Sequence, residues 1–252
     1  MSTDDMGAFD DKVAIITGAA SGVGRATARR FVADGAKVYG IDINADGLAA
    51  VADELGDAFV GAVHDISSRA ACRAAVADCV ERFGGVDIVA NVAGIARSHH
   101  VTDVTEDEWR LMMGVNLDGM FWLTQAAIPH LLERAGNVVN VSSNAGLMGQ
   151  AYTVPYCASK GAVINMTKAF AMEFIKTDLR FNCVAPGGMV TGLTESFSMP
   201  DDVDFSLMQP YMGYRGMAEP ETCANAIAWL ASDEASRCTG SVLSVDGGLT
   251  AA

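Results

Sequence analysis

Seven short apolar runs, separated by longer segments of helical periodicity, constrain the fold of this chain more than any other feature. The runs are KVAIIT (12–17), AKVYGID (36–42), AFVGAVH (58–64), VDIVAN (86–91), NVVNVSS (137–143), RFNCVAP (180–186) and SVLSVDG (241–247). Such alternation is typical of parallel strands joined by right-handed helical crossovers. Apolar residues follow one another within the runs, which indicates that helices cover both faces of the sheet. The sequence therefore predicts an α/β fold with a doubly wound parallel sheet of about seven strands.

This pattern continues through the chain without a linker that would divide it. With 252 residues, 50% of them hydrophobic, the chain can bury a large core, and we expect a single domain spanning residues 1–252. One segment departs from the alternation of strands and helices. It comprises residues 192–216, GLTESFSMPDDVDFSLMQPYMGYRG, and is irregular and rich in methionine and aromatic residues. We interpret this segment, called the flap below, as a cover over a binding site.

Charge and composition exclude several classes of partner. Seventeen basic against 31 acidic residues give a formal net charge of -14, which repels phosphate backbones and anionic membrane surfaces. The amino-terminal stretch MSTDDMGAFDD has no apolar core, and no segment approaches the roughly 18 uninterrupted apolar residues of a membrane span. We therefore expect a soluble cytoplasmic protein that acts on a small molecule, with neither nucleic acid nor membrane as a partner.

The cysteines and histidines show no spacing that indicates a metal site. The six cysteines stand at positions 72, 79, 157, 183, 223 and 238 without a C-x-x-C pair, and we interpret them as reduced, mostly buried thiols. Two adjacent histidines, His99 and His100, lack nearby carboxylate or cysteine ligands at metal-binding spacing. We place these histidines on the rim of a substrate pocket instead.

Three glycines follow the first predicted strand at once. The stretch TGAASGVG (17–24) puts Gly18, Gly22 and Gly24 at a strand-to-helix turn. Small residues there let a ligand approach the backbone, and the free N–H groups at a helix amino terminus favour a pyrophosphate. Because a strand precedes the glycines and a helix follows them, the turn predicts a dinucleotide-binding site.

The second predicted strand carries a residue that distinguishes between dinucleotides. It ends at Asp42, about 20 residues beyond the glycine turn, where a carboxylate can accept hydrogen bonds from both hydroxyls of the adenosine ribose. A 2′-phosphate at this place would meet like charge. Ile43 and Asn44 follow, so no arginine reverses the sign, and the sequence predicts a preference for NAD over NADP.

Five motifs in register resemble the short-chain dehydrogenase/reductase family. They are TGAASGVG (17–24), NVAG (91–94), Asn116, the serine pair 142–143 and YCASK (156–160). The pair Pro-Gly at 186–187 with Thr191, and VDGG at 245–248, extend the resemblance over essentially the whole chain. Val92 departs from it, because the family often has a second asparagine there. The resemblance implies a Rossmann-type fold and hydride transfer between NAD and an alcohol or ketone.

The resemblance implies a catalytic role for the stretch YCASK. Tyr156 and Lys160 lie on one face if the segment is helical, and a nearby cation favours the phenolate. The resemblance implies that Tyr156 is the general acid/base, that Lys160 lowers its pKa and holds the nicotinamide ribose, and that Ser143 orients the reacting oxygen. Ser142 should point the other way on its strand. Asn116 resembles the family's fourth catalytic residue, which distorts its helix and supports a water chain to the lysine.

The predicted cofactor contacts come from the same motifs. They are Gly18, Ser21, Gly22, Val23, Gly24, Asp42, Ile43, Asp65, Ile66, Asn91, Ala93, Gly94, Tyr156, Lys160, Pro186, Gly187, Met189 and Thr191. The family places an aspartate against the adenine where this chain has Asp65. The same residue also stands where it can cap the next helix, and both roles remain open.

The surface expected around the nicotinamide is adaptable and largely apolar. The predicted substrate contacts are Asn144, Met148, Gln150, Tyr152 and Gly188, and the flap adds Phe197, Met199, Phe205, Met208, Tyr211, Met212 and Tyr214. Such a surface favours a hydrophobic secondary alcohol or its ketone, for example a cyclic, terpenoid, aromatic or steroid-like compound. A polyol or sugar remains an alternative, as does a carrier-bound 3-oxoacyl group, although basic residues that would dock an acidic carrier are scarce.

An alternative from another class is a non-catalytic regulator that binds a dinucleotide. Such a protein need not keep the four residues Asn116, Ser143, Tyr156 and Lys160 together, and their joint presence favours an enzyme.

Two helical segments carry more apolar residues than one sheet face can bury. Residues 106–132 have apolar side chains all round the predicted helix, and the helix after Tyr156 has alanines on one side and larger apolar residues, including Val163 and Phe170, on another. A second copy packed against both helices would bury the surplus. We therefore expect a homo-oligomer, with a tetramer favoured over a dimer.

Overall fold

The computed structural model describes residues 7–191 and 199–251. Its centre is one seven-stranded sheet in which every pairing is parallel and the strand order is β3-β2-β1-β4-β5-β6-β7. The strands are β1 Val13–Thr17, β2 Lys37–Asp42, β3 Phe59–Val63, β4 Ile88–Asn91, β5 Asn137–Val141, β6 Arg180–Pro186 and β7 Val242–Val245. The predicted fold class, strand number and single domain are confirmed.

The strand order reverses beside β1, which fixes where a ligand can bind. From β1 the chain adds β2 and β3 on one side, and it then returns to place β4 against the other side, with Ala14 opposite Ile88. Because all pairings are parallel, the carboxyl ends of the strands meet at one edge. Crevices at such reversals, beyond the carboxyl ends, are the usual ligand sites of open α/β sheets.

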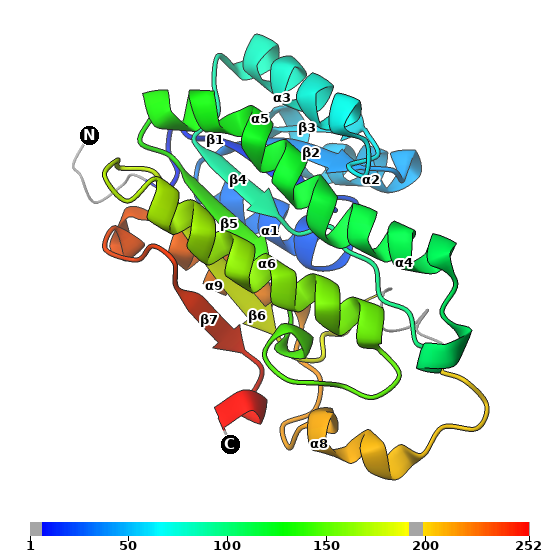
Figure 1. Ribbon diagram of the computed structural model, residues 1–252. Coiled ribbons are helices and arrows are strands. Elements are labelled where there is room, and N and C mark those ends of the chain that lie inside the picture. The colour runs from blue at the N-terminus through cyan, green and yellow to red at the C-terminus, as the bar shows by residue number, and fades with distance from the viewer. Residues whose placement is uncertain (1–6, 192–198, 252) are drawn as a thin grey trace.

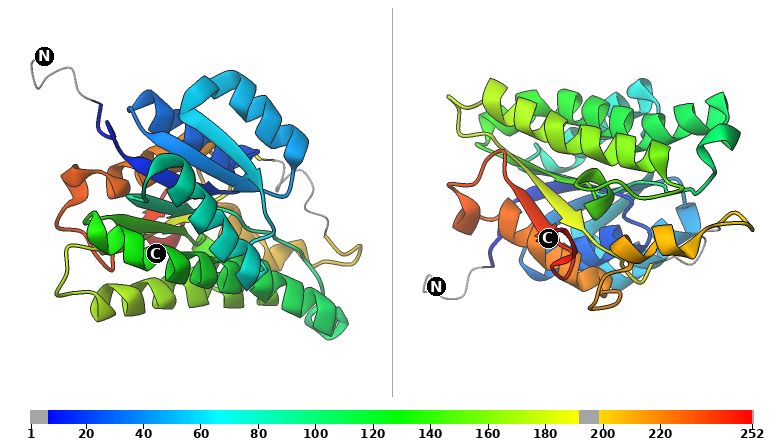
Figure 2. Two further views of the ribbon diagram at one scale, coloured as in Figure 1. Left: turned by 90° about the horizontal axis from the view of Figure 1, so that it is seen from above. Right: turned by 60° about the horizontal axis from the view of Figure 1, so that its bottom comes forward.

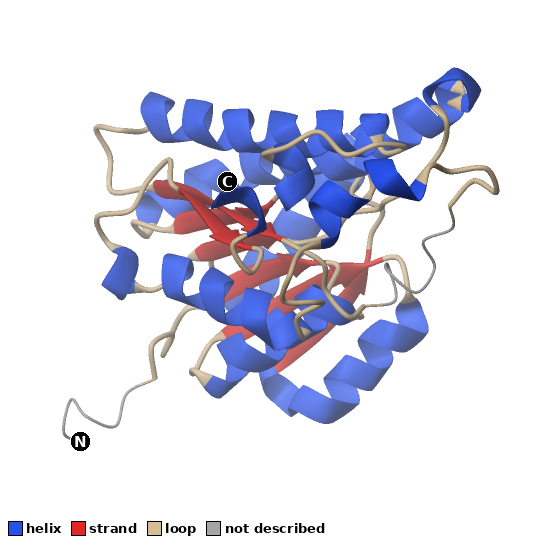
Figure 3. Ribbon diagram, turned by 90° about the horizontal axis from the view of Figure 1, so that it is seen from below, coloured by secondary structure: helices blue, strands red, loops and turns tan. Residues whose placement is uncertain are grey.

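Helices cover both faces of the sheet, as Figures 2 and 3 show. The longer helices are α1 Gly22–Ala33, α2 Ala45–Leu55, α3 Arg69–Phe83, α4 Glu106–Met113, α5 Gly119–Glu133, α6 Val154–Glu173 and α9 Pro220–Ala231. Figure 1 shows α3, α5 and α6 in front of the sheet, with α1 and α9 behind it. The uninterrupted apolar strands therefore have a helical layer on each side, as the sequence predicted.

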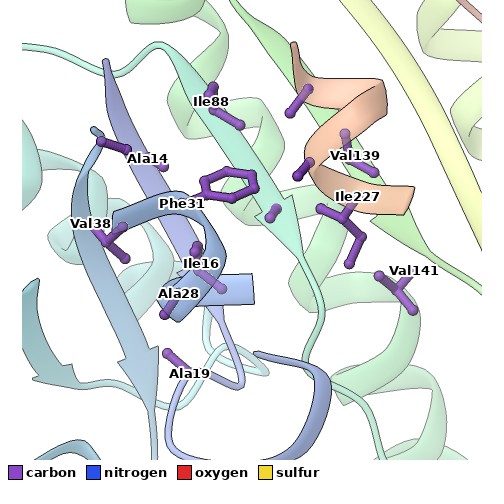
Figure 4. Packing of buried hydrophobic residues seen from close by; sticks show 14 of the residues in the cluster. Ala14, Ile16, Ala19, Ala28, Phe31, Val38, Ile88, Val139, Val141 and Ile227 are labelled. Atoms are coloured by element: carbon purple, nitrogen blue, oxygen red, sulfur yellow. The ribbon is translucent and has the colours of Figure 1, made fainter. Parts of the chain in front are cut away.

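Each face of the sheet has its own core. On the first face, Phe31 of α1 and Ile227 of α9 pack with Ile16 and Val139 from the strands, as Figure 4 shows. The second core joins residues of α3, α5 and α6 to the opposite sides of the same strands. Stacked rings of Phe121, Phe170 and Phe181 form part of this second core. Val92, which departs from the family pattern, packs partly buried against the first core.

The helical run predicted over residues 106–132 is interrupted. A capping box between Thr105 and Glu108 starts α4, and the π-helical turn Gly114–Asp118 then separates α4 from α5. Asn116 lies within this turn and is fully buried. Inserted turns of this kind often occur at functional sites.

The described part of the flap, residues 199–216, holds two short helical turns. They are the 3₁₀ turn Phe205–Leu207 and α8 Gln209–Met212. Figure 1 shows α8 at the lower edge, beyond the carboxyl ends of β6 and β7. The predicted pocket residue Phe197 lies outside the described residues.

Within residues 7–191 and 199–251, none of the helices has the length and apolar character needed to cross a membrane. The same residues contain no group of three or more His, Cys, Asp or Glu side chains arranged to hold a metal ion.

Candidate active site

The glycine turn after β1 is tight enough to require glycine. Gly18 and Gly22 have φ angles of 70° and 50°, a region that residues with a side chain rarely adopt. A Cβ on Gly24 would lie 2.0 Å from the Gly18 carbonyl oxygen, and one on Gly18 would lie 3.0 Å from Cα of Ala93. The turn thus packs directly against the segment that follows β4.

The amino terminus of α1 opens onto this turn and suits an anion. Ser21 occupies the N-cap position, but its side chain makes no capping hydrogen bond among the described residues, and the first turn of α1 contains no acidic residue. Thr191 faces the turn from the other side, since a Cβ on Gly22 would lie 3.2 Å from Cγ2 of Thr191. The glycine cradle and the helix amino terminus fit the pyrophosphate of a dinucleotide.

Asp42 ends β2 beside the glycine turn. Its carboxylate accepts hydrogen bonds from the backbone N–H of Ala20 at 3.1 Å and of Asn44 at 3.0 Å. The next side chain, Ile43, is 72% exposed. The carboxylate therefore has a structural task in holding the turn, and it also presents negative charge at the place predicted for the adenosine ribose.

Asn91, one of the predicted cofactor contacts, has a buried side chain that forms hydrogen bonds inside the core. Its side chain is 1% exposed, and its Nδ2 donates to Thr124 of α5 at 3.0 Å and to Asn140 of β5 at 2.8 Å. The Nδ2 group of Asn91 thus ties β4 to its neighbours inside the core. Thr17 supports the same segment, because its Oγ1 accepts the N–H groups of Val92 and Ala93.

One of the two roles considered for Asp65, capping of the next helix, is wrong. The helix α3 begins at Arg69, and Ser68 caps it by accepting the N–H of Ala71. Asp65 lies too far upstream to cap this helix and instead accepts from the N–H and hydroxyl of Ser67. Asp65 is exposed, while Ile66 beside it is buried.

Lys160 and Asn116 lie together behind Gly94. Lys160 is 3% exposed, and its Nζ donates to the carbonyl of Val141 at 3.0 Å. Asn116 forms two hydrogen bonds with the backbone of Ile95, one to its N–H at 2.8 Å and one to its carbonyl at 2.9 Å. A Cβ on Gly94 would lie 3.1 Å from Lys160 Nζ and 3.2 Å from Asn116 Oδ1, so a side chain here would press on both groups.

The electrostatics of the pair Tyr156 and Lys160 differ from the sequence expectation. Burial raises the pKa of the Tyr156 phenol, and the interaction with the Ser143 side chain only opposes this shift. Burial likewise lowers the pKa of Lys160 to about 8. The expected lowering of the Tyr156 pKa by Lys160 is therefore wrong for the protein by itself, because the loss of hydration outweighs the effect of nearby groups.

The two serines after β5 point to different partners. Ser142 Oγ donates to the carbonyl of Lys160 at 2.7 Å, so it binds the backbone of α6. Ser143 Oγ donates to Asn144 Oδ1 at 3.0 Å, and that same oxygen accepts from Gln150 Nε2 at 3.2 Å. Ser143 thus belongs to a small polar network with Asn144 and Gln150, whereas Ser142 does not.

The remaining predicted substrate residues lie on two loops, one after β5 and one after β6. Met148 and Tyr152 are partly buried after β5, and Gly188 is exposed after β6. The Tyr152 hydroxyl accepts the backbone N–H of Asp204 from the flap at 2.8 Å. Sequence reasoning missed this contact and that of His100 with Asp202, because neither follows from local spacing.

The segment after β6 lies between the glycine turn and β7. Gly187 donates its N–H to the carbonyl of Val245, and Met189, which is buried, pairs with Ala218. Beside Gly187 and Gly188 there is a cavity of about 510 Å³. It is also lined by Arg215, Gly216, Ala218, Thr222, residues 244–248, Thr250 and Ala251.

The apolar residues of the flap divide between two environments. Met208 and Tyr211 are partly buried. Phe205, Met212 and Tyr214 are 70%, 66% and 105% exposed, so they do not line an enclosed pocket in this arrangement. The physical reason is the shortness of the two turns, which present one side to the protein and the other to solvent.

Comparison with known proteins agrees with these features. Residues 18–250 match the family model described as enoyl-(acyl carrier protein) reductase. The chain is 38% identical over 244 residues to meso-2,3-butanediol dehydrogenase from Serratia marcescens, covering 96% of each protein. It is also 38% identical over 246 residues to 3-oxoacyl-[acyl-carrier-protein] reductase FabG from Thermotoga maritima, covering 96% of this chain and 98% of that protein.

A solved structure extends the likeness to the fold. The short chain dehydrogenase from Mycobacterium paratuberculosis bound to NAD superposes with a TM-score of 0.90 at 32% identity, covering 98% of this chain and 100% of that one. Sheet order, glycine turn and sequence similarity over the whole length lead to one assignment. The chain belongs to the short-chain dehydrogenase/reductase family and is an NAD(P)-dependent dehydrogenase that acts on CH–OH groups.

Proposed function

We propose that this protein is an NAD-dependent dehydrogenase of hydrophobic secondary alcohols, with Tyr156 as the general acid/base. The observation that carries the proposal is the convergence of Tyr156, Lys160, Ser143 and Asn116. The last three are buried, and Lys160 Nζ lies 5.8 Å from the centre of the Tyr156 ring. A protein that only bound a dinucleotide would not need these buried polar groups, whose desolvation costs free energy.

In alcohol oxidation, Tyr156 accepts the proton of the substrate hydroxyl at its phenolic oxygen. A nicotinamide bound in this site supplies the hydride acceptor in oxidation and the hydride donor in reduction. Because burial raises the pKa of Tyr156, its proton is held until positive charge near the phenol favours the phenolate. Lys160, whose pKa is lowered to about 8, is still mostly charged at neutral pH and contributes to that charge.

Ser143 orients the oxygen that reacts. In the structure its hydroxyl donates to Asn144 Oδ1, so it has to turn from Asn144 to donate to a substrate oxygen. Asn144 Oδ1 then still accepts from Gln150, which keeps this oxygen partnered during the turn. Asn116 holds the segment after β4 at Ile95 and thereby fixes the space in front of Lys160.

NAD is the proposed cofactor because of the charge at Asp42. Its carboxylate lies beside the glycine turn, bonded to the N–H of Ala20, and a 2′-phosphate there would meet like charge. Ile43 is exposed and supplies no cation in exchange. The contacts proposed for the pyrophosphate are the amino end of α1 and Thr191.

A hydrophobic substrate is supported by Met148, Met208 and Tyr211, which are partly buried around the carboxyl end of the sheet. A small diol is the second candidate. It is favoured by the amides of Asn144 and Gln150, which lie in the Ser143 network and can bind a second hydroxyl.

We also propose that the protein works as a homo-oligomer, with a tetramer favoured over a dimer. The observation behind this is the apolar surface of α4 and α6, where Trp109, Val154 and Met172 are 42%, 47% and 68% exposed. An apolar hollow lined by Val101, Trp109 and Val154, among other residues, lies on the same surface. Some of the apolar side chains that were predicted to exceed what one sheet face can bury are covered within the chain. The Trp122 ring, for example, lies 4.7 Å below the guanidinium of Arg69.

The test is a panel of alcohols and carbonyl compounds with purified protein, read from the absorbance of reduced nicotinamide. Cyclohexanol, menthol and phenylethanol with NAD represent the hydrophobic class, butanediol and sorbitol the polyols, and an acetoacetyl thioester with NADH the oxoacyl class. Highest kcat/KM in the first group supports the proposal. If the protein binds NADH but turns over none of these compounds, the result would support a non-catalytic protein that only binds the dinucleotide.

A further inference from the structure

Three loops that are distant in sequence meet at Tyr152. From the loop after β4, the His99 N–H donates to the Tyr152 carbonyl at 2.8 Å, and the His100 ring meets the Tyr152 ring edge-on at 5.2 Å. From the flap, the N–H of Asp204 donates to the Tyr152 hydroxyl at 2.8 Å. One side chain in the loop before α6 therefore contacts both neighbouring loops.

Two further contacts join the flap to the same place. His100 Nε2 lies 2.8 Å from Asp202 Oδ1, which lowers the pKa of the Asp202 carboxyl. The Tyr211 hydroxyl donates to the carbonyl of Ala151 at 3.0 Å. All three contacts join positions at least 52 residues apart in sequence, so they exist only while the flap lies against the loops.

The backbone of Tyr152 supports a specific role for this residue. Its φ angle is 65°, in the left-handed region, which is unfavourable for a residue that carries a Cβ. Surrounding contacts must hold such a conformation, and strained residues of this kind concentrate at ligand clamps and switch regions. Tyr152 also stands four residues before Tyr156, so its position is coupled to the start of α6.

We propose that Tyr152 is a positioning residue that docks the described part of the flap, residues 199–216, at the candidate active site, together with the contacts of His100 with Asp202 and Tyr211 with Ala151. The inference rests on the proposed function for its effect on substrate binding. It reassigns the Tyr152 hydroxyl from the predicted substrate contact to an anchor of the flap. The flap then forms one side of the substrate site, and its position is set by residues that do not touch the reacting atoms.

Trypsin can report docking without any substrate. Arg215 is the only lysine or arginine between Arg180 and Arg237, and it lies in the flap and is exposed. Cleavage after Arg215 yields fragments 1–215 and 216–252, which mass spectrometry identifies. Proteolysis of a local segment follows the population of its open form when opening and closing are fast, so the cleavage rate measures docking.

Tyr152→Phe removes only the oxygen that accepts the Asp204 N–H. Loss of one hydrogen bond should raise the cleavage rate after Arg215 by about tenfold. The matched control is Tyr214→Phe, because Tyr214 lies in the same segment with a fully exposed side chain. With NAD and cyclohexanol, Tyr152→Phe should raise KM while kcat changes by less than about twofold, as expected for a residue outside the chemical step.

A double-mutant cycle between His100→Gln and Asp202→Asn tests the second contact, with Asp201→Asn as the control for charge on the flap. The two single substitutions and the double variant should accelerate cleavage by similar factors, because each removes the same interaction. Cleavage by Tyr152→Phe at the wild-type rate, or equal acceleration by Tyr214→Phe, would overturn the inference. Faster cleavage in a protein that turns over no alcohol would keep the docking role and reject the proposed function.

Discussion

Lys160 Nζ lies 5.8 Å from the centre of the Tyr156 ring and donates to the Val141 carbonyl at 3.0 Å. The ammonium is thus held by the end of β5 on one side and by the approach of Gly94 on the other. Burial acts on the two groups in opposite directions, raising the pKa of Tyr156 and lowering that of Lys160 to about 8. Both shifts favour the neutral forms, but with a pKa of about 8 Lys160 is still mostly charged at neutral pH, whereas Tyr156 is neutral.

The burial of Lys160 should make the free energy of unfolding depend on pH. The folded pKa of about 8 lies below the ordinary 10.5, so between these values the unfolded chain binds more protons and stability rises with pH. Compared with Lys160→Met, the wild-type free energy of unfolding should increase by about 1.4 kcal/mol per pH unit in this window. Denaturant titrations of both proteins from pH 7.5 to roughly 10 measure the difference.

The buried cysteines act in the opposite direction, because burial raises the pKa of Cys79 and Cys223 to about 12. They are present in both proteins, so their effect largely cancels in the comparison. A difference in unfolding free energy that stays constant with pH would show that burial does not lower the pKa of Lys160 in the folded protein.

The two adjacent serines provide a matched pair. Ser143→Ala should lower kcat by about a hundredfold, because it removes a donor to the reacting oxygen. Ser142→Ala loses the hydrogen bond to the Lys160 carbonyl and should cost about 1 kcal/mol of stability, with a much smaller change in kcat. Steady-state kinetics and thermal unfolding of both variants separate the two effects. Equal losses of kcat would remove Ser143 from its proposed role.

Cofactor preference should change with the charge at the end of β2. Asp42→Asn combined with Ile43→Arg removes a carboxylate, keeps one acceptor for the N–H groups of Ala20 and Asn44, and adds a partner for a 2′-phosphate. The ratio of kcat/KM for NADP to that for NAD should rise by about tenfold or more. Ile43→Arg alone keeps the repulsion between Asp42 and a 2′-phosphate, so the ratio should rise less in this variant. A wild-type protein that already prefers NADPH would contradict the assignment of NAD.

The sequence predicted the parts of this molecule that depend on local pattern. The seven strands, the glycine turn and the position of Asp42 all follow from short-range periodicity and spacing, although β5 and β7 each end two residues before the predicted runs do. Asn116 in a π-helical turn also follows the expectation that the family resemblance implied.

Features that depend on distant contacts could not be predicted in this way. Asn91 bonds Thr124 and Asn140 because β4, β5 and α5 converge there, which no local spacing of Asn91 indicates. The rise in the Tyr156 pKa depends on how many atoms bury the phenol, a property of the whole fold. The contact of Tyr152 with Asp204 joins two loops whose relative position the sequence does not specify.

Assembly should depend on the exposed side of α6. Light scattering at micromolar concentration should give a multiple of the 26.3 kDa chain mass, most simply four chains. Ala169→Glu places a charge on the exposed side of α6 and should shift the protein toward smaller assemblies. Ala50→Glu, at an exposed position of α2, is the control and should leave the mass unchanged. A wild-type mass of one chain would contradict the proposal.

Turnover by Tyr156→Phe is the most direct measurement of the central claim. The substitution removes the phenolic oxygen and keeps the ring, so NADH binding should stay within about threefold of wild type while kcat falls by at least about a hundredfold. Fluorescence titration with NADH and steady-state oxidation of the best alcohol by NAD, on the same preparation, give both quantities. A Tyr156→Phe variant that binds NADH and oxidises the alcohol at nearly the wild-type rate would contradict the account.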